Sequence, residues 1–409
     1  MKFPLYFSRK ITFSKDNKNN LSRVIVFIGR LSTALGIIVS LITVSTGLGS
    51  KRAIKERTSD FVGHISIKSE HSNASYNSSP LSDENFNLEK IKSLPDVDHV
   101  QNFATVSGIL RTKDNFAGII FKGVGKDFDR NRFQKFLIEG NVPKITEDGY
   151  NNEIVISEKL AGDLNLKLTD SIVAVFSKAD QKPIYRKFAV VGIYKTDIKM
   201  IDDMYIIGDI NHARKILEMN DKQSGGLEIF LKNINRMDDD FPEIETLAGY
   251  KNYAQKATDI YPEIVDFINI FDKNIAVIIA LMLMVVVINI IMVLLILIIE
   301  RTNSIGILKT LGASNSQIRT IFINYTLMIM IPGLLIGNFV GLSLLLIQKF
   351  FGVIRLSPEN YYVSVVPVDL DIFNILAISA GILLVSALAL ILPSFLISKI
   401  SPVKSIKYE

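Results

Sequence analysis

The stretch that comes nearest to enzyme chemistry is GVGKDF, from Gly123 to Phe128. A phosphate-binding loop needs G-x-x-x-x-G-K-[ST], in which backbone amides hold the phosphates and the Ser/Thr hydroxyl holds magnesium. Here Asp127 stands where the hydroxyl must be, and the first glycine is misplaced. We therefore interpret the stretch as a turn after a strand, and we expect that the chain does not hydrolyse ATP itself.

The other polar residues form no catalytic or metal-binding pattern. The chain has no cysteine, and its 4 histidines lack metal-ligand spacing; they are His64, His71, His99 and His212. The motif G-x-S-x-G of a nucleophile elbow is absent. Two carboxylate groups, Asp202–Asp203 and Asp238–Asp240, are better explained as solvated turns than as an acid–base pair. The sequence predicts no catalytic residue, no metal site and no cofactor in this chain.

Charge excludes one further class of function. The chain has 46 basic and 41 acidic residues, a net charge of +5. Nucleic-acid binding usually needs a concentrated basic stripe, and so small an excess gives no case for it.

Four apolar segments could cross a bilayer, which needs about 20 mostly apolar helical residues. We predict transmembrane helices over 24–50, 271–299, 320–349 and 371–397. A cleaved signal peptide is the alternative for the first segment. About thirty residues precede its apolar run and no A-x-A cleavage site follows it, so we interpret it as an uncleaved span.

The basic residues give the orientation, because short cytoplasmic flanks are enriched in Lys and Arg. They concentrate in the segments 1–23, 300–319 and 398–409, whereas 350–370 has one basic residue against two acidic ones. The basic residues are Lys2, Arg9, Lys10, Lys15, Lys18, Arg23, Arg301, Lys309, Arg319, Lys399, Lys404 and Lys407. With four spans, both termini are cytoplasmic, and 51–270 and 350–370 lie outside.

The outside segment 51–270 alternates between strand and helix patterns, which predicts a mixed α+β domain. The expected strands are HISIK, AGIIFKGV, EIVIS, DSIVAVF, KFAVVGIY, MYIIG and LEIFL. The expected helices are Leu88–Leu94, Glu158–Leu164 and Asn211–Met219.

The cytoplasmic segment 300–319 has apolar residues near helical spacing: Ile305, Leu308, Leu311 and Ile318. A connector needs only a few polar residues, whereas an ordered apolar face must be covered by something. We favour a helix that docks on a partner over a passive loop, and expect Leu308→Glu to abolish that association.

Within the membrane segments, Gly333, Gly337 and Gly341 form a ridge of small residues that lets another helix approach closely. The sequence leaves open whether that helix belongs to this chain or to a partner. Asn289 is the only plainly polar residue of the second span, and we expect it to form an interhelical hydrogen bond. The second span is either a rigid rod that transmits movement or a simple anchor.

The order of these parts resembles the permease subunits of the MacB/FtsX/Lol group of ABC transporters, and most of all the lipoprotein-releasing LolC/LolE permeases. The segment IGILKTLGAS resembles the family's coupling helix, although Ser304 stands where the family commonly has Glu. The segment LSPENYYVSVVPVDL carries the family signature at Tyr361, Tyr362 and Pro367. The membrane exit GLGSKRAIKERTSDFVGHISI and the tail ISPVKSIKYE also match. The coupling residues implied by the resemblance are Glu300, Ile305, Gly306, Ile307, Leu308, Lys309, Leu311, Gly312, Ala313 and Ser314.

The resemblance implies a MacB-like periplasmic core domain on four transmembrane helices in the inner membrane of a Gram-negative-type bacterium. It also implies a cytosolic LolD-like ATPase dimer, which binds the ATP and Mg²⁺, and a second permease subunit, identical or related. The function implied is the release of acylated lipoproteins to a periplasmic carrier, with an apolar groove between the first two spans. The segment Ser177–Lys187 occupies the position of the LolC carrier-binding hook, but it is short.

Three other functions fit parts of the pattern. An FtsX-like transmitter that activates a cell-wall hydrolase usually has a smaller outside domain. A MacB-like efflux component typically carries a fused ATPase. A membrane-anchored receptor would leave the docking helix unexplained.

Overall fold

The computed structural model describes residues 20–72, 76–84, 86–146, 149–177 and 182–395, and the chain divides into two compact units. One unit comprises residues 20–51, 269–355 and 365–395 of the described chain and is helical; the other comprises Arg52–Ile268 and Leu356–Ser364. The expected cytoplasmic tail, 398–409, and residues 1–19 lie outside the described residues.

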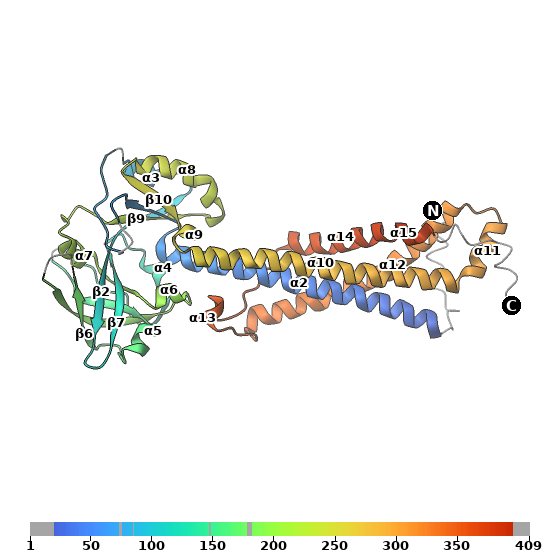
Figure 1. Ribbon diagram of the computed structural model, residues 1–409, viewed down its shortest axis with the longest axis horizontal. Helices are drawn as coiled ribbons and strands as arrows, with labels where there is room; N and C mark the ends of the chain where they lie inside the picture. Colours follow the sequence, from blue (N-terminus) through green and yellow to red (C-terminus); the bar gives the residue numbers. More distant parts are fainter. Residues whose placement is uncertain (1–19, 73–75, 85, 147–148, 178–181, 396–409) are drawn as a thin grey trace. The chain divides into compact units, whose positions relative to one another are not determined.

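Four helices in the described part of the chain are long and apolar enough to cross a membrane. They are α2 (Asn20–Val62), α10 (Pro262–Glu300), α12 (Asn315–Phe351) and α14 (Ile372–Ala389) (Figure 1). The chain turns at Leu390 before a short helix, α15 (Ile391–Ser394), so the segment expected to be one span over 371–397 is broken there. The shorter helix α11 (Thr302–Thr310) lies between α10 and α12 in the sequence.

Local chemistry sets the ends of α12. Ser314 and Gln317 form a capping box at its start, and Gly352 ends it in the left-handed conformation, at φ +56°. The core of the helical unit is aliphatic, and its most buried members come from several helices. They include Ile37, Leu41, Leu294, Leu297, Ile305 and Ile329.

The other unit is built on a 10-stranded mixed sheet with the order β10-β1-β9-β2-β3-β8-β5-β7-β4, to which β6 adds by pairing with β2 and β7. The strands are β1 (Ile65–Ser69), β2 (Val97–Arg111), β3 (Phe116–Val124), β4 (Leu137–Gly140), β5 (Glu153–Ser157), β6 (Ser171–Phe176), β7 (Ile184–Tyr194), β8 (Tyr205–Asp209), β9 (Gly226–Leu231) and β10 (Asn252–Lys256). The helices are α3 (Leu88–Lys92), α4 (Arg130–Gln134), α5 (Glu158–Asp163), α6 (Lys199–Asp202), α7 (Ile210–Leu217), α8 (Met237–Ala248), α9 (Ala257–Ile260) and α13 (Pro358–Tyr361), with a 3₁₀ turn η1 (Ile234–Arg236).

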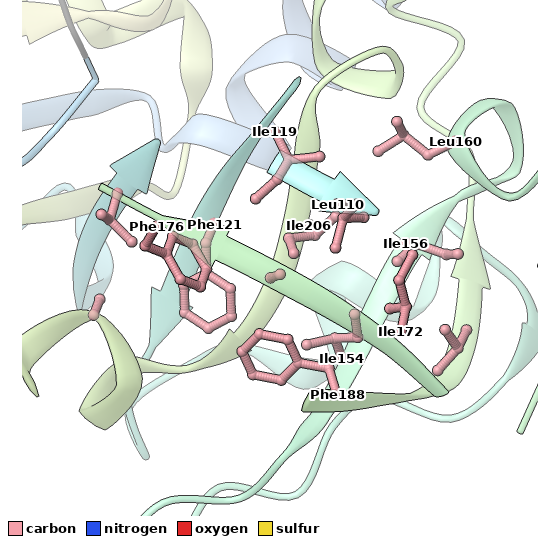
Figure 2. Close-up of a cluster of buried hydrophobic side chains, with 14 of the residues drawn as sticks. Leu110, Ile119, Phe121, Ile154, Ile156, Leu160, Ile172, Phe176, Phe188 and Ile206 are labelled. Atoms are coloured by element: carbon pink, nitrogen blue, oxygen red, sulfur yellow. The ribbon is translucent and has the colours of Figure 1, made fainter. Parts of the chain in front are cut away.

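This sheet unit holds two separate apolar clusters. One lies around Phe121, Phe176 and Phe188, where the rings of Phe121 and Phe188 stack with centroids 5.4 Å apart (Figure 2). The other places Ile65 and Ile67 of β1 with Ile244 of α8. The fold is therefore a mixed α+β domain, and its two cores fix the strands that carry the polar residues described below.

Candidate functional site

The segment expected to dock on a partner is the helix α11 and the turn after it. Its inner side is anchored in the helical unit, because Ile305 is fully buried and Gly306 is also buried. Leu308 is half-buried and packs against the same core. Ile318, the first buried residue of α12, is fully enclosed as well.

The outer side of this segment is apolar and open. Ile307 is 52% exposed and Leu311 is 80% exposed, and their i, i+4 spacing sets them on one side. Gly312 turns the chain at φ +90°, a conformation that a side chain would disfavour. The single apolar face expected from Ile305, Leu308, Leu311 and Ile318 is thus divided between an anchoring side and an exposed side. We define the coupling surface as Ile307 and Leu311.

The remaining predicted coupling residues surround this surface. Glu300 ends α10 and is half-buried, as is Lys309 in α11. Ala313 packs against the core, and Ser314 caps α12. Nine of the ten predicted residues thus lie in α11 and the turn after it, Glu300 lies at the end of α10, and only part of the set is accessible.

The glycine ridge of α12 lies against α2 of the same chain. A Cβ added at Gly333 would lie 2.5 Å from the carbonyl oxygen of Arg30, and one at Gly337 would lie 2.8 Å from that of Ala34. At Gly341 the nearest atom would be a methyl of Leu41, at 3.1 Å. Backbone approach this close is possible only without side chains, so the three positions form the seam between the two helices.

A second glycine seam joins α2 to α10. A Cβ at Gly36 would lie 2.3 Å from Val286, and one at Gly47 would lie 2.5 Å from Ile275. The helices are therefore packed tightly at these positions, and the lipid groove expected between the first two spans is not open there.

The polar residue of the second span does not act as expected. Asn289 Nδ2 donates to Val285 O in its own helix, at 2.9 Å, and the described residues provide no interhelical bond for it. A polar side chain in an apolar helix can satisfy itself this way because the i−4 carbonyl is always within reach. The interhelical bond is formed elsewhere, between Ser379 Oγ of α14 and Asn338 Oδ1 of α12, at 3.0 Å.

The signature residues lie in the segment between α12 and α14. Tyr362 ends α13 at φ +55°, and its ring meets that of Phe267 edge-on at 5.0 Å, both within the sheet unit. Tyr361 is 46% exposed. Pro367 belongs to the helical unit, where a Cβ at Gly49 would lie 2.8 Å from its carbonyl oxygen.

Gln348, near the end of α12, is a residue that the sequence did not indicate. It is 7% exposed, and its amide donates to Ile354 O and Val366 O, both at 3.1 Å, while its oxygen accepts from Ile354 N at 2.8 Å. These bonds fix the backbone on both sides of the signature segment. A single Gln in an apolar run was the available signal.

The polar candidates of the sheet unit have structural roles. Asp127 accepts hydrogen bonds from the backbone and the side chain of Asn102, so the glycine-rich stretch is a turn after β3. Asp238–Asp240 lie in the first turn of α8, where the helix dipole favours acidic residues. Within the described residues, no group of three or more His, Asp or Glu side chains could hold a metal ion.

Asp202 corrects the expectation of a solvated turn. Its side chain is 7% exposed and accepts from Thr196 N, Thr196 Oγ1 and Asp197 N, at 3.0, 2.8 and 3.0 Å. Burial raises the pKa of this carboxyl to about 6. The residue closes a tight turn ahead of α6, and its hydrogen bonds explain why a carboxylate is there.

The segment Ser177–Lys187 comprises the connection between β6 and β7 and the first four residues of β7, and the two strands pair antiparallel from Ser171↔Ala189 to Phe176↔Ile184. Residues 178–181 lie outside the described residues. The expected hook therefore corresponds to the connection of a β-hairpin.

The comparisons with known proteins agree with this architecture. Residues 31–239 match the MacB-like periplasmic core domain, and residues 276–402 match the C-terminal part of FtsX-like permeases. These matches define the class as a permease with a periplasmic domain. The four long apolar helices fit such a membrane protein. The first match covers half of the chain, and the chain belongs to this MacB-like family, within the Lol/MacB/FtsX group of ABC-transporter permeases.

The curated relatives are similar over nearly the full length. The chain is 24% identical to "Lipoprotein-releasing system transmembrane protein LolE" of Haemophilus influenzae, over 98% of both chains. It is 20% identical to the LolC protein of Xylella fastidiosa, over 93% of this chain and 92% of that one. The solved periplasmic region of MacB from Actinobacillus actinomycetemcomitans is 16% identical, with a TM-score of 0.33, over 49% of this chain and 92% of that one.

Proposed function

We propose that this chain is the permease subunit of an ABC transporter that extracts acylated lipoproteins from the outer leaflet of the inner membrane and passes them to a periplasmic carrier. The observation that carries the proposal is the similarity to LolE and LolC over nearly the whole chain. Both termini would be cytoplasmic, and the sheet unit periplasmic.

The energy would come from a separate cytosolic ATPase dimer, which would bind ATP and Mg²⁺, since this chain offers no phosphate-binding loop. The coupling surface, Ile307 and Leu311, supports this proposal because two large apolar side chains on a cytoplasmic helix favour a protein partner. A push on α11 would reach α10 directly, because Arg301 alone separates them.

The physical task is to move acyl chains out of the bilayer, at a cost of about 0.8 kcal/mol per CH₂ group. An apolar groove would offset part of that cost. Because the seam between α2 and α10 is packed at Gly36 and Gly47, we place this groove between the chain and a second permease subunit, identical or related.

Purification of the tagged chain from native membranes, with mass spectrometry of bound proteins before and after ATP, tests the proposal. We expect a cytosolic ATPase and acylated lipoproteins to copurify, and the lipoproteins to leave when ATP is added. An ATPase accompanied by a cell-wall hydrolase, with no lipoprotein, would contradict lipoprotein release. It would favour the FtsX-like transmitter, which the match over residues 276–402 also allows.

A further inference from the structure

One face of the sheet in the sheet unit is polar although it is largely buried. In β1, Ile65 and Ile67 point into the apolar cluster with α8, so Ser66 and Lys68 must point to the opposite face. Ser66 is 1% exposed and Lys68 is half-buried. A strand with apolar residues on one face and polar residues on an enclosed face is unusual, because polar groups lose hydration when they are buried.

The register of the neighbouring strands gathers more polar side chains on this face. Ser66 lies opposite Glu228 of β9 and Gln255 of β10, and Lys68 lies opposite Tyr253 of β10. These residues line a cavity of about 260 Å³, together with Lys122 of β3. Drug-sized ligands usually occupy about 300–1,000 Å³, so this cavity suits a smaller molecule.

Two of the charged groups in the cavity satisfy each other. Lys122 Nζ lies 2.6 Å from Glu228 Oε1, and both side chains are 3% exposed. Gln101 Nε2 donates to the other carboxylate oxygen at 2.7 Å, and Lys122 also donates to Phe61 O at 2.6 Å. Glu228, the one carboxylate among the described residues that line the cavity, is therefore already engaged by two donors.

Two donors on β1 are left without an acceptor. In the part of the chain that the structure describes, no hydrogen bond or ion pair joins Lys68 Nζ to another residue. Burial lowers the pKa of Lys68, as does the neighbouring Lys122, while Glu228 opposes the change. The hydroxyl of Ser66 is fully buried without a hydrogen-bond partner among the described residues, whereas Lys68 is half-buried. Buried polar groups nearly always have a partner, so a ligand with acceptor oxygens would complete the site.

We propose that this cavity binds a small oxyanion, a carboxylate or a phosphate group, held by Lys68 Nζ and Ser66 Oγ. The cavity contains two ammonium groups and one carboxylate, and one bound anion would balance its charge. Charge-assisted hydrogen bonds from an ammonium and a hydroxyl are suited to such a group. The site is independent of the proposed lipoprotein release, because it requires only the periplasmic domain.

The test measures the binding of inorganic phosphate and of acetate to the purified full chain in detergent. Isothermal titration calorimetry gives the affinity for each anion, with the ionic strength matched by chloride. We expect saturable binding of one of the two anions, and the responding anion identifies the chemistry. Lys68→Met should weaken this binding at least about tenfold. Ser66→Ala should weaken it by a smaller factor. The matched control is Lys113→Met, at an exposed lysine away from the cavity, which should bind as the wild type does.

The thermal unfolding midpoint of each variant, measured without anion, shows whether weaker binding comes from loss of the site or from loss of the folded structure. Lys68→Met removes a partly desolvated ammonium, so we expect its midpoint to be no lower than that of the wild type. No saturable binding of either anion to the wild type would overturn the proposal. So would equal affinity of a folded Lys68→Met chain.

Discussion

At Gly337 the residue type decides whether two helices can meet. A Cβ there would lie 2.8 Å from the carbonyl oxygen of Ala34 and 3.0 Å from its Cα, whereas Gly381 of α14 has no heavy atom within 4 Å of the same position. The two glycines are chemically identical, and only their neighbours differ. They provide a matched pair for testing the seam between α2 and α12.

We expect Gly337→Leu to destabilise the chain by about 1–3 kcal/mol, because overpacking forces the helices apart. The thermal midpoint of the purified protein in detergent measures this effect. Gly381→Leu should leave the midpoint near that of the wild type. Equal midpoints for the two variants would contradict the seam.

His64 makes the stability of the sheet unit depend on pH. Its ring is 5% exposed, and Nδ1 accepts from Leu231 N at 2.8 Å. Burial, and secondarily the charge of Arg132, lower the pKa of His64 from 6.5 to about 4. Between these values the unfolded chain binds more protons than the folded chain, so the stabilisation from neutral His64 is present above pH 6.5 and is lost as the pH falls to 4.

We predict that this residue contributes about 3 kcal/mol of pH-dependent stability over that range, from about 1.4 kcal/mol per pKa unit. Asp202 acts in the opposite direction, because its raised pKa makes the folded chain bind more protons between 3.8 and about 6. Denaturant unfolding of the wild type and of His64→Gln at pH 7 and pH 4.5 isolates the histidine, since Asp202 is present in both. A constant difference in unfolding free energy between the two proteins would refute the prediction.

At the scale of elements, α11 has one side buried in the helical unit and one side exposed. Ile305 is fully buried, whereas Leu311 is 80% exposed. A charge at Leu308 would disturb a half-buried residue that packs on the core, so loss of binding in Leu308→Glu would not separate docking from folding. Substitutions on the coupling surface avoid this difficulty.

We expect Ile307→Glu and Leu311→Glu to abolish copurification of the partner ATPase, because a carboxylate would have to be desolvated at the interface. The amount of chain in the membrane should stay unchanged, since both side chains are exposed. Ser316→Glu is the matched control, an exposed position in the first turn of α12 where an acidic residue is favourable. Unaltered copurification in both coupling variants would disprove docking through this surface.

At the scale of the whole molecule, the sheet unit has its own two apolar cores. The first and last strands of the unit, β1 and β10, pair antiparallel from Ile65↔Lys256 to Ser69↔Asn252, so the ends of the unit are neighbours. We predict that residues 52–268 fold as a soluble monomer when expressed alone. Size-exclusion chromatography and near-UV circular dichroism measure this, and aggregation with no tertiary signal would be the contrary result.

Much of the architecture followed from local pattern. Short strands rich in Val and Ile, such as EIVIS and MYIIG, match β5 and β8, and the expected helix at Asn211–Met219 overlaps α7. The longest strand, β2, was missed, as was α8. The sequence of β2, VDHVQNFATVSGILR, lacks clean alternation because it pairs with three different strands, and its environment changes along its length.

The sequence by itself determined which segments are apolar enough to span a bilayer, where the basic flanks lie, and where the apolar segment between the second and third spans and the glycine ridge lie. These properties depend on composition and on spacing within one segment. Only the tertiary structure decided that the ridge meets α2, that Leu311 is exposed while Ile305 is buried, and that Asn289 bonds within its own helix. The polar cavity around Lys68 also arises from strands far apart in the sequence. Whether a side chain is buried, and which group it contacts or bonds, depends on contacts between segments distant in the sequence, and no local pattern encodes these contacts.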